Sequence, residues 1–170
     1  MSDSEKVRAE IGRRLYAHCP SPGEYQDDLY QPHLLEQYKL YVEMADRISE
    51  RRGVANAFFA TLNTVLLTSI IGFIEAHKSE NAYILPLVGI VVSIVWAVLL
   101  RSYRNLNSAK FTVVGLLEEK LPASPYWHAE WYALGEGKNW RKHIPLSPIE
   151  TYVPAVFAMF YAFLVYSWYG

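Results

Sequence analysis

The sequence predicts an all-α membrane protein with three transmembrane helices. The first two are expected to form a long antiparallel hairpin that extends into the cytoplasm. Three uncharged apolar stretches support this prediction, at about residues 54–74, 82–100 and 152–169. Each is close to the length of about 20 residues that a helix needs to cross a hydrocarbon core of about 30 Å. A water-soluble helix of this length would normally carry a polar face.

Basic residues indicate the orientation of these helices. Of the 16 Lys and Arg residues, only Lys78 lies in the loop that joins the first two spans. Cytoplasmic loops carry an excess of Lys and Arg, so the N-terminus and residues 101–151 are predicted to be cytoplasmic and the C-terminus periplasmic. The localisation that follows is a membrane that the chain crosses several times. The N-terminal residues lack the apolar region of a secretory signal peptide.

Four segments divide the chain. Residues 1–31 are interpreted as a cytoplasmic amphipathic helix and linker, in which Val7, Ile11 and Leu15 share one face. This helix is expected either to pack on the cytoplasmic part of the protein or to lie on the membrane surface. Residues 32–121 form the predicted hairpin, residues 122–151 an aromatic-rich interfacial segment, and residues 152–170 the third transmembrane helix.

The predicted hairpin continues beyond the membrane on heptad seams. The first helix is expected to start near Pro32, and its seam residues recur at intervals of four and three: Leu34, Tyr38, Tyr41, Ala45 and Ile48. The returning helix carries a less regular seam and is expected to end at Pro122. Its members are Tyr103, Leu106, Lys110, Val113 and Leu117.

Polar and small residues within the first two spans indicate helix contacts. Asn56 and Asn63 lie on one face of the first span, where lipid offers their amides no partner. With Thr64 they are candidates either for interhelical hydrogen bonds or for the lining of a polar path. Small residues that let helices approach closely form one stripe on each span. These are Ala57, Thr61, Thr64, Thr68 and Gly72 on the first, and Gly89, Ser93 and Ala97 on the second.

Arginine and tryptophan residues are expected to mark the membrane boundaries. The segment that precedes the third span predicts a helix over residues 126–134, with Ser124-Pro125 as its start and Gly135 and Gly137 as its stop. Ser147 with Pro148 predicts the start of the last helix. The predicted interface anchors are Arg51, Arg52, Arg101, Arg104, Trp127, Trp131 and Trp140.

Candidates for chemistry are few. His33 and Glu36 have a spacing found in metal sites of helical bundles, but such a site needs further ligands. The candidates for these ligands are the pair Glu118 and Glu119, and the pair His128 and Glu130. Their ordinary interpretation is as capping or solvated groups, so we expect no metal, no cofactor and no catalytic residues. The formal net charge of −1 gives no general affinity for nucleic acid.

The order of these features resembles a known family. The hairpin is followed by Tyr-Trp-His-Ala-Glu-Trp at 126–131, Leu-Gly-Glu-Gly at 134–137 and Pro-Leu-Ser-Pro-Ile-Glu before the last span. In this order the chain resembles the small inner-membrane proteins of the RipA family over roughly residues 34–166. The resemblance implies a homo-oligomer, expected to be an octamer, in the inner (cytoplasmic) membrane of a bacterium. Its expected partners are membrane lipids and other copies of the chain.

Three functions are compatible with this sequence. The favoured hypothesis is a non-enzymatic membrane scaffold that assembles through its helices and aromatic residues. The alternative is an oligomeric channel or pore along the symmetry axis, lined by Asn56, Asn63 and the threonine stripe. The second alternative is a lipid-modifying or interfacial enzyme that uses His128, Glu130 and His143.

Overall fold

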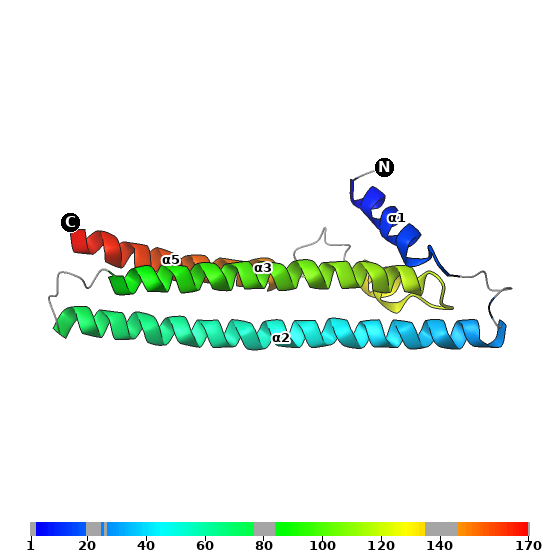
Figure 1. Ribbon diagram of the computed structural model, residues 1–170, viewed down its shortest axis with the longest axis horizontal. Helices are drawn as coiled ribbons and strands as arrows, with labels where there is room; N and C mark the ends of the chain where they lie inside the picture. The colour runs from blue at the N-terminus through cyan, green and yellow to red at the C-terminus, as the bar shows by residue number, and fades with distance from the viewer. Residues whose placement is uncertain (1–2, 20–24, 26, 77–83, 135–145, 170) are drawn as a thin grey trace. The chain divides into compact units, whose positions relative to one another are not determined.

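The protein is helical throughout the part of the chain that the structure describes (Figure 1). The computed structural model describes residues 3–19, 25, 27–76, 84–134 and 146–169, and these contain no strand. Three helices of the described residues are long and apolar enough to cross a membrane: α2 (Asp27–Ala76), α3 (Ile84–Glu118) and α5 (Leu146–Tyr169). The first two are the longest and pack against each other, which confirms the predicted all-α fold with a long hairpin.

The two hairpin helices extend well beyond a membrane thickness. Helix α2 (Asp27–Ala76) has 50 residues and α3 (Ile84–Glu118) has 35. At 1.5 Å per residue α2 is about 75 Å long. It begins at Asp27, five residues before Pro32, where the sequence places its start. Pro32 therefore lies inside the helix, where it lacks the N–H that would bond to the carbonyl of Asp28. Helix α3 ends at Glu118, four residues before Pro122.

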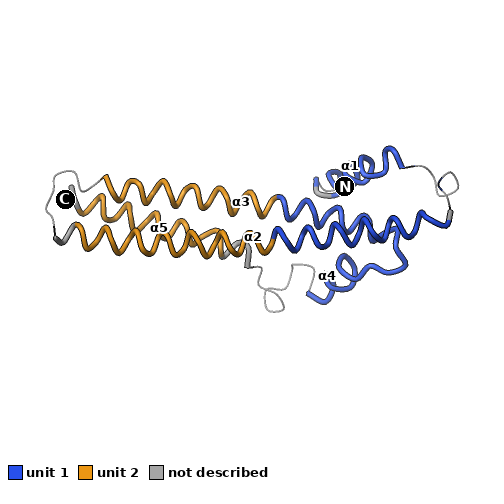
Figure 2. The backbone as a smooth tube through the Cα atoms, turned by 60° about the horizontal axis from the view of Figure 1, so that its bottom comes forward, with its two compact units in different colours: residues 1–48, 106–144 blue, residues 49–105, 145–170 orange. Residues whose placement is uncertain are grey.

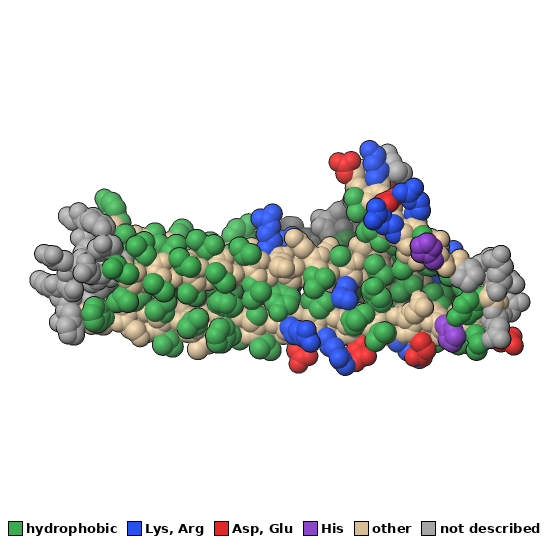
Figure 3. Space-filling view, in the orientation of Figure 1, with side chains coloured by type: hydrophobic (Ala, Val, Ile, Leu, Met, Phe, Trp, Pro, Cys, Tyr) green, Lys and Arg blue, Asp and Glu red, His purple; other side chains and the backbone are tan. Residues whose placement is uncertain are grey.

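The chain divides into two compact units, which are coloured separately in Figure 2. Unit 1 comprises residues 1–48 and 106–144, and unit 2 comprises residues 49–105 and 145–170. The hydrophobic surface of the spans belongs to unit 2, and Figure 3 shows hydrophobic side chains over the visible face of these helices.

In unit 1 the first heptad seam faces inward, as the sequence predicts. Leu34 and Ala45 are buried and the other three seam residues are partly buried. The second seam is wrong at Leu106, which is 49% exposed, while the adjacent Asn107 is partly buried. Lys110 keeps its seam position because its ammonium lies 4.9 Å from the centre of the Tyr41 ring, a favourable cation–π contact.

Helix α1 (Asp3–Leu15) packs on the end of α3 within unit 1. The Tyr16 hydroxyl donates a hydrogen bond of 2.9 Å to the carbonyl of Leu116, and Gly12 faces the Leu116 side chain. Val7, which the sequence pattern places on the packed face, is 59% exposed. At this turn of α1 the packed residue is Arg8 and not Val7, because Arg8 is partly buried and contacts Glu119 and Trp127.

In unit 2 the spans of α2 and α3 pack with α5 (Leu146–Tyr169). Trp96 and Tyr161 are fully buried, and the Trp96 ring contacts Phe59 and Phe157. The small-residue stripe on α3 is a packing face, since Gly89 and Ser93 are buried. The stripe on α2 behaves differently, because all five of its residues are exposed within the described protomer.

The segment after α3 folds as two short helical pieces. A π-helical turn, η1 (Pro125–Glu130), runs directly into α4 (Trp131–Ala133). The sequence predicts helix here, and Pro125 occupies the first turn as expected. The predicted stop at Gly135 and Gly137 lies outside the described residues, as do Trp140 and His143.

Candidate functional site

Glu118 is the most heavily engaged polar side chain in unit 1. It is the last residue of α3 and only 1% exposed. Each carboxylate oxygen accepts two hydrogen bonds. Oε1 accepts from the Tyr38 hydroxyl at 2.9 Å and the Tyr126 backbone N–H at 3.1 Å. Oε2 accepts from the Ser124 hydroxyl at 2.7 Å and the Trp127 backbone N–H at 2.9 Å.

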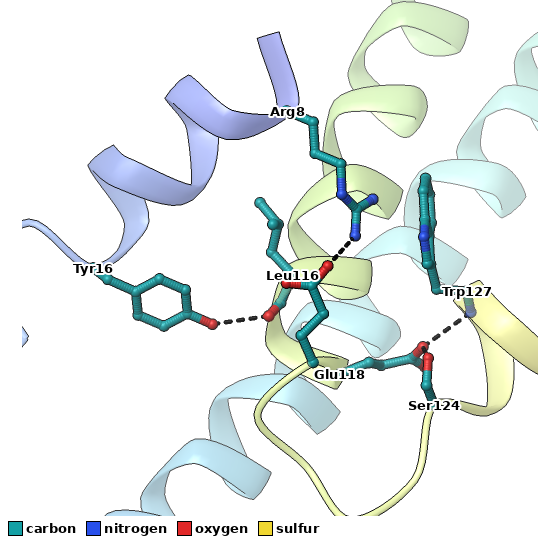
Figure 4. Close-up of polar contacts among 7 residues, drawn as sticks. Arg8, Tyr16, Leu116, Glu118, Ser124 and Trp127 are labelled. Atoms are coloured by element: carbon teal, nitrogen blue, oxygen red, sulfur yellow. Dashed lines mark hydrogen bonds and ion pairs between the residues drawn. The ribbon is translucent and has the colours of Figure 1, made fainter. Parts of the chain in front are cut away.

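The Glu118 carboxylate caps the N-terminal end of η1, although Glu118 itself belongs to α3. The first N–H groups of a helix have no partner within the helix and carry a partial positive charge. Ser124, the residue at the cap position of η1, makes no side-chain cap of its own and donates to Glu118 instead. Figure 4 shows Ser124 and Trp127 meeting the Glu118 carboxylate. Glu118 therefore joins the end of α3 to α2 and to η1.

The ionised form of Glu118 is stabilised by these donors. Glu118 lies outside the predicted membrane spans, 18 residues beyond the end of the second at Leu100. Burial alone would raise the pKa of its carboxyl. Hydrogen bonds from Trp127, Ser124, Tyr126 and Tyr38 outweigh burial and hold the pKa below the ordinary value of 4.5.

A pH dependence of unit 1 follows from this lowered pKa. A carboxyl whose pKa is lower in the folded state contributes stability that is complete above its unfolded pKa and is lost as the pH falls through the folded pKa. We expect the backbone amides of Tyr126 and Trp127 to keep their protection from hydrogen exchange near neutral pH and to lose it on acidification below 4.5. Exchange followed by mass spectrometry, corrected for the intrinsic pH dependence, measures this loss, and Glu118→Gln should abolish its pH dependence.

Arg8 adds a second contact to the same end of α3. Its Nη2 lies 2.6 Å from Oε1 of Glu119, and its guanidinium carbon lies 3.9 Å from the centre of the Trp127 ring (Figure 4). The Trp127 ring also packs closely on Gly115 of α3, where an added Cβ atom would lie 2.8 Å from Cε3 of the ring. Trp127, predicted to be an interface anchor, thus packs between α1 and α3. Trp131 is 46% exposed.

A hydrogen-bond network connects the helices of unit 2. Asn63 is fully buried, and its side chain donates to the carbonyl of Phe59 and accepts from the Ser93 hydroxyl at 3.0 Å. The Tyr161 hydroxyl of α5 donates to the backbone carbonyl of Asn63 at 3.0 Å. The three spans therefore meet around Asn63, and hydrogen bonds within the protomer occupy its side chain.

The other two polar candidates of the first span have different surroundings. Asn56 is partly buried and accepts a hydrogen bond of 3.1 Å from the Trp96 indole N–H. Thr64 is exposed, and its hydroxyl donates back to the carbonyl of Ala60 at 2.8 Å. Asn56 and Asn63 therefore form hydrogen bonds between α2 and α3, whereas the Thr64 side chain is exposed.

The boundary arginines also separate into two groups. Arg52 is partly buried and lies 3.5 Å from the Glu150 carboxylate of α5. The other three are exposed: Arg51, Arg101 and Arg104.

The candidates for metal or acid–base chemistry are not brought together. Nδ1 of His33 lies 2.7 Å from the Tyr25 hydroxyl, whereas Glu36 pairs with Lys39. His128 and Glu130 are exposed on η1. Among the described residues, no group of three or more His, Cys, Asp or Glu side chains could hold a metal ion.

Sequence reasoning missed Ser93, Trp96 and Tyr161 as polar partners, and it considered Glu118 only as a possible metal ligand. The sequence does contain a signal for Ser93, Trp96 and Tyr161. Each residue carries a donor inside an apolar span, where an unpaired donor is costly. For Glu118, the signal was a carboxylate at a helix end shortly before a Ser-Pro helix start.

The three apolar helices and the network that joins them define a multi-pass helical membrane protein. Comparison with known families gives a narrower assignment, because the Octameric membrane protein family (8xMP) matches residues 35–168. The chain belongs to this family. The match confirms the octameric membrane family expected from the sequence.

No curated protein and no solved structure matches the chain.

Proposed function

We propose that the protein is a non-enzymatic scaffold of a bacterial inner membrane that assembles as a homo-octamer. Its N-terminus and unit 1 are cytoplasmic and its C-terminus is periplasmic in this proposal. Membership of an octameric membrane family supports the assembly, and the distribution of basic residues supports the orientation.

One observation carries the scaffold proposal: the buried polar side chains engage each other within the protomer. Asn63, Ser93 and Tyr161 form one bonded group in unit 2, and Glu118 accepts four hydrogen bonds in unit 1. Groups committed in this way fix the arrangement of helices and are poorly placed to move a proton or bind a substrate. They favour a rigid structural role.

The channel remains the second candidate because of the exposed threonine stripe on α2. Thr61, Thr64 and Thr68 present a mildly polar face that the described part of the protomer leaves uncovered. Eight copies that turned this face toward a common axis would surround that axis with threonine side chains.

Ion flux in liposomes distinguishes the two functions. For a scaffold, we expect liposomes that contain the purified octamer to show the same flux as protein-free liposomes, and Thr64→Val to change nothing. Thr112→Val is the matched control, because Thr112 also donates to the carbonyl four residues earlier but lies on α3 beyond the predicted span. A flux above background that falls in Thr64→Val and not in Thr112→Val would overturn the scaffold proposal in favour of a channel.

A further inference from the structure

A shallow groove of about 550 Å³ lies on unit 2 at the arginine-rich end of the spans. Its polar part is formed by Glu50, Arg51 and Tyr103, and its apolar part includes Val54 and Phe58. The predicted first span begins at Val54 and the second ends at Leu100, so the groove lies where headgroups give way to hydrocarbon. This position is independent of whether the protein is a scaffold or a channel.

The groove presents one charge of each sign. Glu50 and Arg51 are both exposed, and within the described part of the chain neither forms an ion pair. The neighbouring Arg52 behaves differently, since it lies 3.5 Å from Glu150. Arg51 and Glu50 are therefore positioned to serve a ligand, whereas Arg52 connects α2 to α5.

The apolar part of the groove continues from these charges toward the membrane interior. Val54 is 66% exposed and Phe58 is 61% exposed. At 1.5 Å per residue they lie about 5 Å and about 11 Å along α2 from Arg51. A ligand of this groove therefore carries a polar end with both charges and an apolar chain that extends from it.

We propose that the groove binds a phospholipid with a phosphoethanolamine headgroup. Arg51 pairs with the phosphate, for which a guanidinium offers several donors, and the Tyr103 hydroxyl is a further donor in the same groove. Glu50 pairs with the primary ammonium. One acyl chain lies along Val54 and Phe58.

The carboxylate of Glu50 selects among headgroups. An ethanolamine ammonium has three N–H donors, whereas a choline ammonium has none and cannot donate a hydrogen bond to a carboxylate. A glycerol headgroup carries no cation, so it would leave Glu50 facing the phosphate without compensation. Basic sites at the cytoplasmic ends of transmembrane helices ordinarily favour anionic lipids, and the acid beside Arg51 changes that preference.

Native mass spectrometry of the purified full-length oligomer tests this assignment. The probes are phosphatidylethanolamine, phosphatidylglycerol and phosphatidylcholine with identical acyl chains. We expect the wild-type protein to retain phosphatidylethanolamine about tenfold better than either competitor, a difference of about 1.4 kcal/mol. Arg51→Gln should lower retention of all three lipids, and Glu50→Gln should remove the preference for phosphatidylethanolamine. Arg101→Gln is the matched control, an exposed boundary arginine that does not line the groove.

Other results would overturn the assignment. Equal retention of the three lipids by the wild-type protein would exclude headgroup selection, and an Arg51→Gln variant indistinguishable from Arg101→Gln would exclude the phosphate contact. Full competition by glycerophosphoethanolamine, which lacks acyl chains, would exclude the apolar contact. Dissociation of the oligomer by Phe58→Ala, read from the same spectra, would show that a second copy of the chain fills the groove.

Discussion

Replacing Glu118 with glutamine is expected to destabilise unit 1 by about 3 kcal/mol, because it disrupts a buried carboxylate that accepts four hydrogen bonds. Each carboxylate oxygen accepts one backbone N–H, from Tyr126 or from Trp127. Whichever way the new amide is turned, its NH₂ group faces one of these two donors. One buried N–H then loses its acceptor, a cost that an exposed substitution does not incur.

Hydrogen exchange at Tyr126 and Trp127 measures this effect locally. A loss of about 3 kcal/mol corresponds to a decrease of about a hundredfold in the protection of these amides. Glu119→Gln provides the control, since the adjacent side chain is 46% exposed and pairs with Arg8 at the protein surface. We expect this control to cost less than about 1 kcal/mol. Equal protection in the two variants would contradict the role assigned to Glu118.

The second large effect is expected in the membrane, at Gly89. A Cβ atom at this position would lie 2.5 Å from Cζ and 2.6 Å from Cδ1 of Tyr161, whose ring is fully buried. Such distances are well inside van der Waals contact, and a ring enclosed on all sides has no room to withdraw. Gly89→Ala should therefore force α3 and α5 apart locally and destabilise unit 2 by about 2 kcal/mol.

Thermal unfolding of the detergent-solubilised protein, followed by tryptophan fluorescence, tests this expectation. Gly72→Ala is the matched control because nothing described lies within 4 Å of a Cβ atom at Gly72. In a helix this control should be neutral or stabilising by up to about 1 kcal/mol. A Gly89→Ala protein that unfolds at the same temperature as Gly72→Ala would show that α3 and α5 do not approach closely at this point.

The sequence was sufficient for the fold, because membrane spans have a strong one-dimensional signal. An uncharged stretch of sufficient length with basic flanks allows few other structures. The first heptad seam was also readable, since Leu34 and Ala45 repeat with the period of a packed helix. Leu106 was misjudged because a regular spacing of three and four cannot distinguish it from Asn107, one residue further around the helix.

The candidate site was less accessible to sequence reasoning. Asn63 was recognised as a residue that needs a partner, but its partners lie 30 and 98 positions away in the chain. No periodicity connects Ser93 or Tyr161 to that asparagine. The role of Glu118 depends on a chain reversal that brings the N–H groups of residues 126 and 127 back to the end of α3.

The network around Asn63 also bears on the order in which the protein is made. Its side chain finds both partners, Phe59 and Ser93, within the first two spans. A ribosome that has released only α2 and α3 has therefore delivered a pair in which the side-chain amide of Asn63 already donates one hydrogen bond and accepts another. The hydroxyl of Tyr161 needs a carbonyl that this pair provides. Biosynthesis can thus proceed in two stages, in which the hairpin inserts first and the last helix docks onto a completed surface.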